Sequence, residues 1–159
     1  MNEILITMQN GDTIKAELYP DIAPVTVEHF LKLIDQKFFD GLIFHRVIQG
    51  FMIQGGGYDA QGNHHEADSI KGEFQKNGVP NPLKHTRGVL SMARTSFPNS
   101  ASSQFFIMHQ DAPHLDGEYA AFGKVTEGLD VVDKIAGVKT NFTDQPVEPQ
   151  VIESIRLIQ

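Results

Sequence analysis

The sequence contains no cysteine among its 159 residues. A thiol nucleophile, a zinc–thiolate site and a disulfide framework are therefore excluded. Tryptophan is also absent, whereas phenylalanine occurs 11 times, so we expect a core or a pocket built on phenylalanine. With 40% hydrophobic and 21% charged residues, the composition is that of an ordinary globular chain, and its length fits one domain spanning residues 1–159.

Targeting signals and positive charge are scarce as well. No apolar run approaches the ~18 residues of a membrane-spanning helix, and residues 1–7 carry no basic stretch of the kind that opens a secretory signal. The 13 Lys and Arg stand against 20 Asp and Glu, which gives a net charge of −7. We therefore expect a cytoplasmic protein whose main partners are neither nucleic acids nor membranes.

Apolar periodicity predicts several short elements. Alternating residues at the start of the chain predict a β-hairpin with its turn at residues 10–12. An apolar stripe from Val27 to Ile34 predicts a helix that begins near Pro24, and a second helix is predicted at residues 129–136. Further strands are predicted at residues 43–48, 51–53, 89–92, 104–108, 122–125 and 151–158.

Two stretches between these strands are predicted to be loops. Residues 55–82 and 95–102 are rich in Gly, Pro, Asn and Ser, and we expect Phe97 in the second loop to pack down onto the protein. Many short strands joined by long loops favour a barrel over a doubly wound sheet. A final strand that pairs with the first would remove the open edges of such a sheet.

Two strand-like segments combine polar and large apolar side chains. The first, residues 44–56, includes Arg46 and Gln54, and the second, residues 102–107, includes Gln104. A lone arginine in a strand is as often a structural ion-pair partner as a ligand contact, and apolar residues there usually belong to a core. Their coincidence nevertheless describes a shallow apolar pocket with a few polar groups, which is the pattern of a ligand site.

The longer motifs follow one another in a specific order. They are Phe-His-Arg-Val-Ile-Gln-Gly-Phe-Met-Ile-Gln-Gly-Gly at residues 44–56, Ser-Met-Ala-Arg at 91–94 with Ser-Ser-Gln-Phe-Phe-Ile at 102–107, and His-Leu-Asp-Gly at 114–117 with Phe-Gly-Lys-Val at 122–125. In this order and spacing they resemble the cyclophilin family in its compact bacterial form, over nearly the whole chain. The resemblance implies a peptidyl-prolyl cis–trans isomerase without cofactor or metal. It also implies a mainly β fold, a closed eight-stranded antiparallel β-barrel with two flanking α-helices.

The resemblance also assigns roles to single residues. Arg46 matches the family's catalytic arginine, and Gln54 matches the glutamine that orients this arginine and the substrate. The family contacts its ligand at Arg94 mainly through the backbone, so we expect the identity of that side chain to matter little. Substrate-binding positions are implied for Phe51, Met52, Ala93, Arg94, Gln104, Phe106, His114, Leu115 and Tyr119.

A guanidinium suits the implied reaction. Rotation about an X–Pro bond is slow because the amide resists twisting, with a barrier of roughly 20 kcal/mol. Hydrogen bonds from Arg46 to the prolyl nitrogen or to the carbonyl of the twisting amide would stabilise the twisted state more than the planar one. The expected partners are proline-containing peptides and unfolded or folding proteins, bound by a monomer.

Two positions depart from the family pattern. His114 stands where many members carry a tryptophan that contacts cyclosporin, so we expect cyclosporin to bind weakly while peptide isomerisation is retained. Tyr119 stands where many members carry histidine, and it can still pack and donate a hydrogen bond.

Two other functions stay open at this point. The first is a peptide-binding or chaperone-like module of the same fold, in which catalysis is incidental. The second is a metal hydrolase that uses His64, His65 and Glu66. The second is disfavoured because adjacent residues on an extended chain point to opposite faces and cannot easily share one ion.

Overall fold

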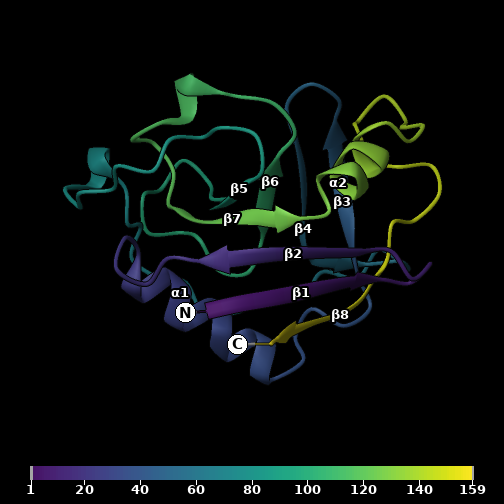
Figure 1. The fold of residues 1–159 in the computed structure, drawn as a ribbon, viewed down its shortest axis with the longest axis horizontal. Coiled ribbons are helices and arrows are strands. Elements are labelled where there is room, and N and C mark those ends of the chain that lie inside the picture. Colours follow the sequence, from purple (N-terminus) through teal and green to yellow (C-terminus); the bar gives the residue numbers. More distant parts are fainter. Residues whose placement is uncertain (1, 159) are drawn as a thin grey trace.

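The computed structural model describes residues 2–158. One antiparallel sheet holds eight strands in the order β3-β4-β6-β5-β7-β2-β1-β8 (Figure 1). Neither α-helix of the described chain is long and apolar enough to cross a bilayer. The elements are β1 (Asn2–Met8), β2 (Thr13–Leu18), α1 (Pro24–Asp35), β3 (Leu42–Ile48), β4 (Met52–Asp59), η1 (Gln75–Asn77), β5 (Val89–Met92), β6 (Phe105–Met108), η2 (Pro113–Leu115), β7 (Ala121–Glu127), α2 (Leu129–Ala136) and β8 (Ile152–Leu157), where η marks a 3-10 helix.

The sheet curls until its two end strands, β3 and β8, meet. The N–H of Phe44 donates to the carbonyl oxygen of Gln150 at 3.0 Å, and the N–H of Gly41 donates to that of Ile152 at 2.8 Å. Strand β8 also pairs with β1, as predicted for the last strand. The predicted barrel with two helices is therefore confirmed, with α1 and α2 on opposite sides of the molecule (Figure 1).

The main difference from the predicted elements lies in β4, which continues through three glycines to Asp59. A Cβ on Gly55 would lie 2.6 Å from the carbonyl oxygen of Ile43, and one on Gly56 would lie 2.8 Å from that of Ser103. Glycine in a strand marks such a close backbone approach. The prediction that these glycines lie in a loop is therefore wrong, because they continue β4, where the close approach of neighbouring backbone explains them.

The loop that follows β5 is fixed by its own hydroxyl groups. The N–H of Thr95 donates to Ser100 Oγ at 2.9 Å, and Ser100 Oγ donates to the carbonyl oxygen of Phe97 at 2.7 Å. The Phe97 residue is 73% exposed. The expectation that its ring packs down is wrong, because these bonds close the loop without any contribution from the ring.

Phenylalanine fills the main core, as its abundance predicts. The ring centroid of Phe30 on α1 lies 4.9 Å from that of Phe39, 5.3 Å from that of Phe105 and 5.0 Å from that of Phe122. All four residues are buried, and full burial of such a side chain contributes roughly 1.5–3 kcal/mol. The barrel is thus packed with side chains, as eight-stranded barrels of this size commonly are.

Alternate residues of the central strands serve two different clusters. Ile53, Phe105 and Ile107 belong to the main core. Met52 and Phe106 point to the other face of the sheet and belong to a second, smaller cluster, because successive side chains of a strand alternate between faces. This second cluster lies outside the barrel, and the candidate site is built against it.

Candidate active site

A hollow of about 130 Å³ lies against the second cluster. Pockets for drug-sized ligands hold roughly 300–1,000 Å³, so this hollow suits one small ring. Every predicted site residue lines it except Gln104 and His114. Its lining residues are Arg46, Phe51, Met52, Gln54, Ala93, Arg94, Phe106, Leu115 and Tyr119.

Strand register brings the central residues of the hollow together. Arg46 on β3 lies opposite Gln54 on β4, and Gln54 lies opposite Phe106 on β6. Met52 is two residues before Gln54 and therefore points to the same face of the sheet. The row places a guanidinium, an amide and an aromatic ring side by side across three strands.

A chain of hydrogen bonds fixes the polar end of this row. Arg46 Nη1 donates to Gln54 Oε1 at 3.2 Å, and Gln54 Nε2 donates to Gln104 Oε1 at 2.9 Å. Gln104 thus contacts the site through Gln54, and its side chain lines the two neighbouring hollows. Within residues 2–158, Arg46 makes no ion pair and this one side-chain hydrogen bond, and it is exposed. Its remaining N–H groups are available to a ligand.

The second guanidinium of the hollow is arranged differently. Arg94 donates three hydrogen bonds to backbone carbonyl oxygens of Thr95 and Glu118. Its charge also lies over two aromatic rings. Of the two arginines, Arg46 is consequently the one that can contact a substrate oxygen or nitrogen.

Aromatic and aliphatic side chains form the rest of the wall. Leu115 is buried at the end of η2, and the Tyr119 ring meets the Phe106 ring edge-on, with centroids 5.8 Å apart. His114 does not line the hollow but stacks on Phe51 at 5.8 Å. It is exposed and therefore lies at the rim, beside the residue that it supports.

Sequence reasoning missed a buried polar group behind Phe106. His85 Nε2 is bonded to Ser91 Oγ at 2.8 Å, and His85 Nδ1 to Asp116 Oδ1 at 3.2 Å. Burial lowers the pKa of His85, against the opposing effect of its bond to Asp116. The residue types are those of a hydrolase triad, but Ser91 is 0% exposed and cannot reach a substrate. The group supports Phe106, whose ring stacks on His85 with centroids 6.0 Å apart.

The histidines considered for a metal site have separate partners. His64 packs on Tyr58 with ring centroids 4.9 Å apart, and His65 Nε2 is bonded to Asp59 Oδ2 at 2.9 Å. That bond is the largest effect lowering the pKa of Asp59 to about 2. In the described part of the chain, no three His, Asp or Glu side chains gather as metal ligands.

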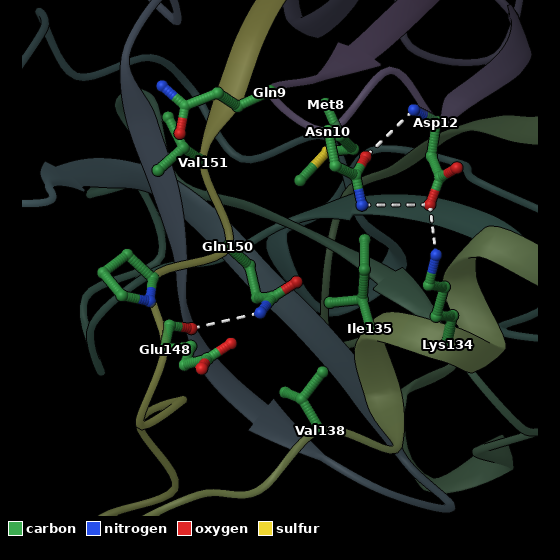
Figure 2. Close-up of a pocket in the computed structure, with 11 residues that line it drawn as sticks. Met8, Gln9, Asn10, Asp12, Lys134, Ile135, Val138, Glu148, Gln150 and Val151 are labelled. Atoms are coloured by element: carbon green, nitrogen blue, oxygen red, sulfur yellow. Dashed lines mark hydrogen bonds and ion pairs between the residues drawn. The ribbon is translucent and has the colours of Figure 1, made fainter.

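A larger hollow of about 320 Å³ lies elsewhere, between the β1–β2 turn, α2 and residues 148–151 (Figure 2). It holds none of the predicted site residues. Lys134 Nζ lies 2.9 Å from Asp12 Oδ2, and Asp12 also accepts a hydrogen bond from Asn10. Because these charged groups bind each other, they are not free to bind a ligand. The larger volume of this hollow is therefore no reason to prefer it as the active site.

Comparison with known proteins agrees with the geometry. A family model described as cyclophilin type peptidyl-prolyl cis-trans isomerase/CLD matches residues 4–157. Peptidyl-prolyl cis-trans isomerase B of Escherichia coli is 44% identical over 92% of this chain and 94% of its own length. A peptidyl-prolyl cis-trans isomerase of Acinetobacter baylyi is 41% identical over 98% of this chain and 86% of its own.

A solved structure shows that the fold is similar as well. A cyclophilin-type isomerase of Cryptosporidium parvum, crystallised in the presence of the dipeptide Ala-Pro, matches with a TM-score of 0.84 and 30% identity. The match covers 99% of each chain. The barrel and its outer pocket therefore define a protein of the cyclophilin fold.

The chain belongs to the cyclophilin-type peptidyl-prolyl cis–trans isomerase family. It is accordingly an isomerase of X–Pro peptide bonds, in an enzyme class that needs no cofactor. The family predicted from the three sequence motifs is confirmed.

Proposed function

We propose that Arg46 catalyses rotation about X–Pro bonds by donating hydrogen bonds to the twisted imide while the apolar hollow holds the prolyl ring. One observation carries the proposal. A guanidinium with available donors stands at the edge of a ring-sized hollow whose other walls are mainly apolar. A guanidinium stays charged at neutral pH and presents its donors in a rigid fork.

The physical basis is differential stabilisation. As the C–N bond twists, the prolyl nitrogen becomes pyramidal and gains a lone pair that a donor can bind. Contacts that strengthen only in the twisted state lower the barrier. Lowering it by ~5 kcal/mol gives between three and four powers of ten in rate. One preorganised donor of this kind contributes about 2.7–4 kcal/mol, which is a large share of that energy. Gln54 contributes by keeping the Arg46 guanidinium in place.

The substrates proposed are proline-containing peptides and unfolded or folding proteins, acted on by a cytoplasmic, monomeric single-domain enzyme that assists folding. The Cryptosporidium parvum relative crystallised with Ala-Pro supports proline as the ring that is bound. We further propose weak cyclosporin binding, because His114 offers a smaller surface at the rim than tryptophan would.

The test compares wild type, Arg46→Ala and Arg46→Lys in an isomerisation assay on an Ala-Pro peptide. We expect Arg46→Ala to lose about 100- to 1,000-fold in kcat/KM, the range found when one oxyanion-type donor is removed. Arg46→Lys should recover only part of this loss, because an ammonium lacks the fork. Near-UV circular dichroism checks that each variant is folded.

Arg156→Lys is the matched control, because Arg156 binds Asp40 through two hydrogen bonds of 2.8 Å away from the hollow. Its activity should equal that of wild type. Full activity of Arg46→Ala would refute the mechanism. A wild type that binds the peptide without accelerating its isomerisation would instead favour the peptide-binding module of the same fold.

A further inference from the structure

We propose that Arg94 is a positioning residue for peptide binding. Its side chain acts as a clamp that holds Tyr119 and the backbone of Glu118 in place at the wall of the hollow. The inference rests on the proposed function, since it assumes that this hollow receives the prolyl ring. It gives Arg94 a role that differs from the expectation that its side-chain identity matters little.

Two aromatic rings hold the Arg94 guanidinium. Its central carbon lies 4.7 Å from the ring centroid of Phe74 and 4.7 Å from that of Tyr119. Phe74 is buried and belongs to the main core. A cation over an aromatic ring within about 6 Å is attracted by it. Arg94 therefore connects a wall residue of the hollow to a ring that is packed in the main core.

Three hydrogen bonds complete the clamp. Arg94 Nε and Nη2 donate to the carbonyl oxygen of Glu118 at 3.1 and 2.6 Å, and Nη1 donates to that of Thr95 at 2.9 Å. Two N–H groups of the fork converge on one oxygen, in the residue just before Tyr119. The planar guanidinium thus fixes both the ring of Tyr119 and the backbone that carries it.

The clamped segment also has other anchors. The Tyr119 ring meets the rings of Phe106 and His85 edge-on, with centroids 5.8 and 6.5 Å apart. The N–H of Lys76 donates to the carbonyl oxygen of Gly117 at 2.9 Å, and Lys76 Nζ lies 3.3 Å from Glu118 Oε1 in an exposed ion pair. Exposed ion pairs of this kind contribute little. Arg94 differs from these anchors because it contacts both the Tyr119 ring and the carbonyl oxygen of Glu118.

Arg94 also lies between two hollows. It lines the small hollow together with Tyr119 and the neighbouring hollow of about 220 Å³ together with Thr95. Losing the clamp would let the wall at Tyr119 move, so the prolyl ring would be held less firmly. The chemistry at Arg46 would change less, because its bond to Gln54 does not involve Arg94.

The experiment uses Arg94→Lys, which keeps the charge but cannot reproduce the planar fork. We expect its dissociation constant for an Ala-Pro peptide, measured by NMR titration, to rise about tenfold. KM should rise in parallel, and kcat should change by less than about threefold, by the same reasoning about Arg46. The control Arg156→Lys should leave both constants unchanged.

A double-mutant cycle with Tyr119→Leu tests whether Arg94 acts through Tyr119. If it does, Arg94→Lys should weaken peptide binding far less in the Tyr119→Leu background than in wild type. Additive effects of the two changes, or wild-type binding by Arg94→Lys, would overturn the proposal.

A further test measures the side-chain NMR signal of Arg94 in the wild-type protein and needs no variant. The Nε–H resonance of Arg94 should be resolved, protected from exchange and shifted when the peptide saturates the site; a rapidly exchanging signal would overturn the clamp. If Arg46→Ala is inactive but the binding measurements contradict the role of Arg94, the mechanism proposed for Arg46 still holds. If Arg46→Ala is fully active, that mechanism is refuted, and the binding measurements still decide whether Arg94 positions Tyr119.

Discussion

Replacing Gln54 with leucine should disable Arg46 without removing it. Leucine has a similar size but can neither accept from Arg46 nor donate to Gln104, so both bonds of the chain, 3.2 and 2.9 Å long, are lost. A net hydrogen bond contributes about 0.5–1.5 kcal/mol, and one to a charged group about 1.5–3 kcal/mol. The bond to Arg46 is long and exposed, so we take about 1.5–3 kcal/mol for the two bonds together.

If all of this energy serves to orient the guanidinium in the transition state, kcat/KM should fall by about 10- to 150-fold. The loss should appear mainly in kcat, because Gln54 acts on the reacting contact through Arg46. The assay follows isomerisation of an Ala-Pro peptide by NMR exchange, and thermal unfolding checks the fold.

Gln104→Leu is the graded comparison, because it removes only the 2.9 Å bond that lies farther from Arg46. Its loss should be smaller, about two- to tenfold, as expected for one neutral hydrogen bond. Activity of Gln54→Leu within about twofold of wild type would show that Arg46 needs no such support. A larger loss in Gln104→Leu than in Gln54→Leu would refute the proposed order of the chain.

Three further changes test stability and ligand binding. Buried Glu73 accepts hydrogen bonds from the N–H and Oγ1 of Thr26 at 2.6 and 2.7 Å, so Glu73→Ala should lower the free energy of unfolding by about 2–3 kcal/mol, and an unchanged urea midpoint would contradict this. Burial, followed by the charges of Arg46 and His64, lowers the pKa of His45 from 6.5 to about 4. The unfolded chain therefore binds the proton first, and stability should fall as the pH drops from about 6.5 to 4; a His45→Gln variant with an equally steep urea-midpoint profile would refute this. His114→Trp should lower the cyclosporin concentration needed for half inhibition by about tenfold, because a larger aromatic surface is buried, and equal potency in the two proteins would contradict it.

The sequence was sufficient for most of the fold because apolar periodicity reflects burial directly. The stripe from Val27 to Ile34 and the alternation around residues 2–18 correspond to α1, β1 and β2. The strand through Gly55 to Gly57 was not predictable in this way, because its glycines are required by contacts with β3 and with residues 103–105 rather than by a turn.

The site was predictable to a similar extent, and for a different reason. Arg46 and Gln54 stand in a long motif, so their proximity follows from pairing of adjacent strands. The bond of His85 with Asp116, and the contact of Arg94 with Phe74, join segments that are distant in sequence. No local spacing encodes such contacts, and only the tertiary structure reveals them.

Because the interior of the barrel is filled, the residues that stabilise the fold are different from those that would select a substrate. Rings such as Phe30 and Phe122 hold the eight strands together without touching the exterior hollow. The residues that would choose among client sequences lie on segments laid over the outside, such as the stretch around Tyr119. Related proteins could therefore acquire new preferences by exchanging these outer segments, while the interior and the melting behaviour that it governs stay the same.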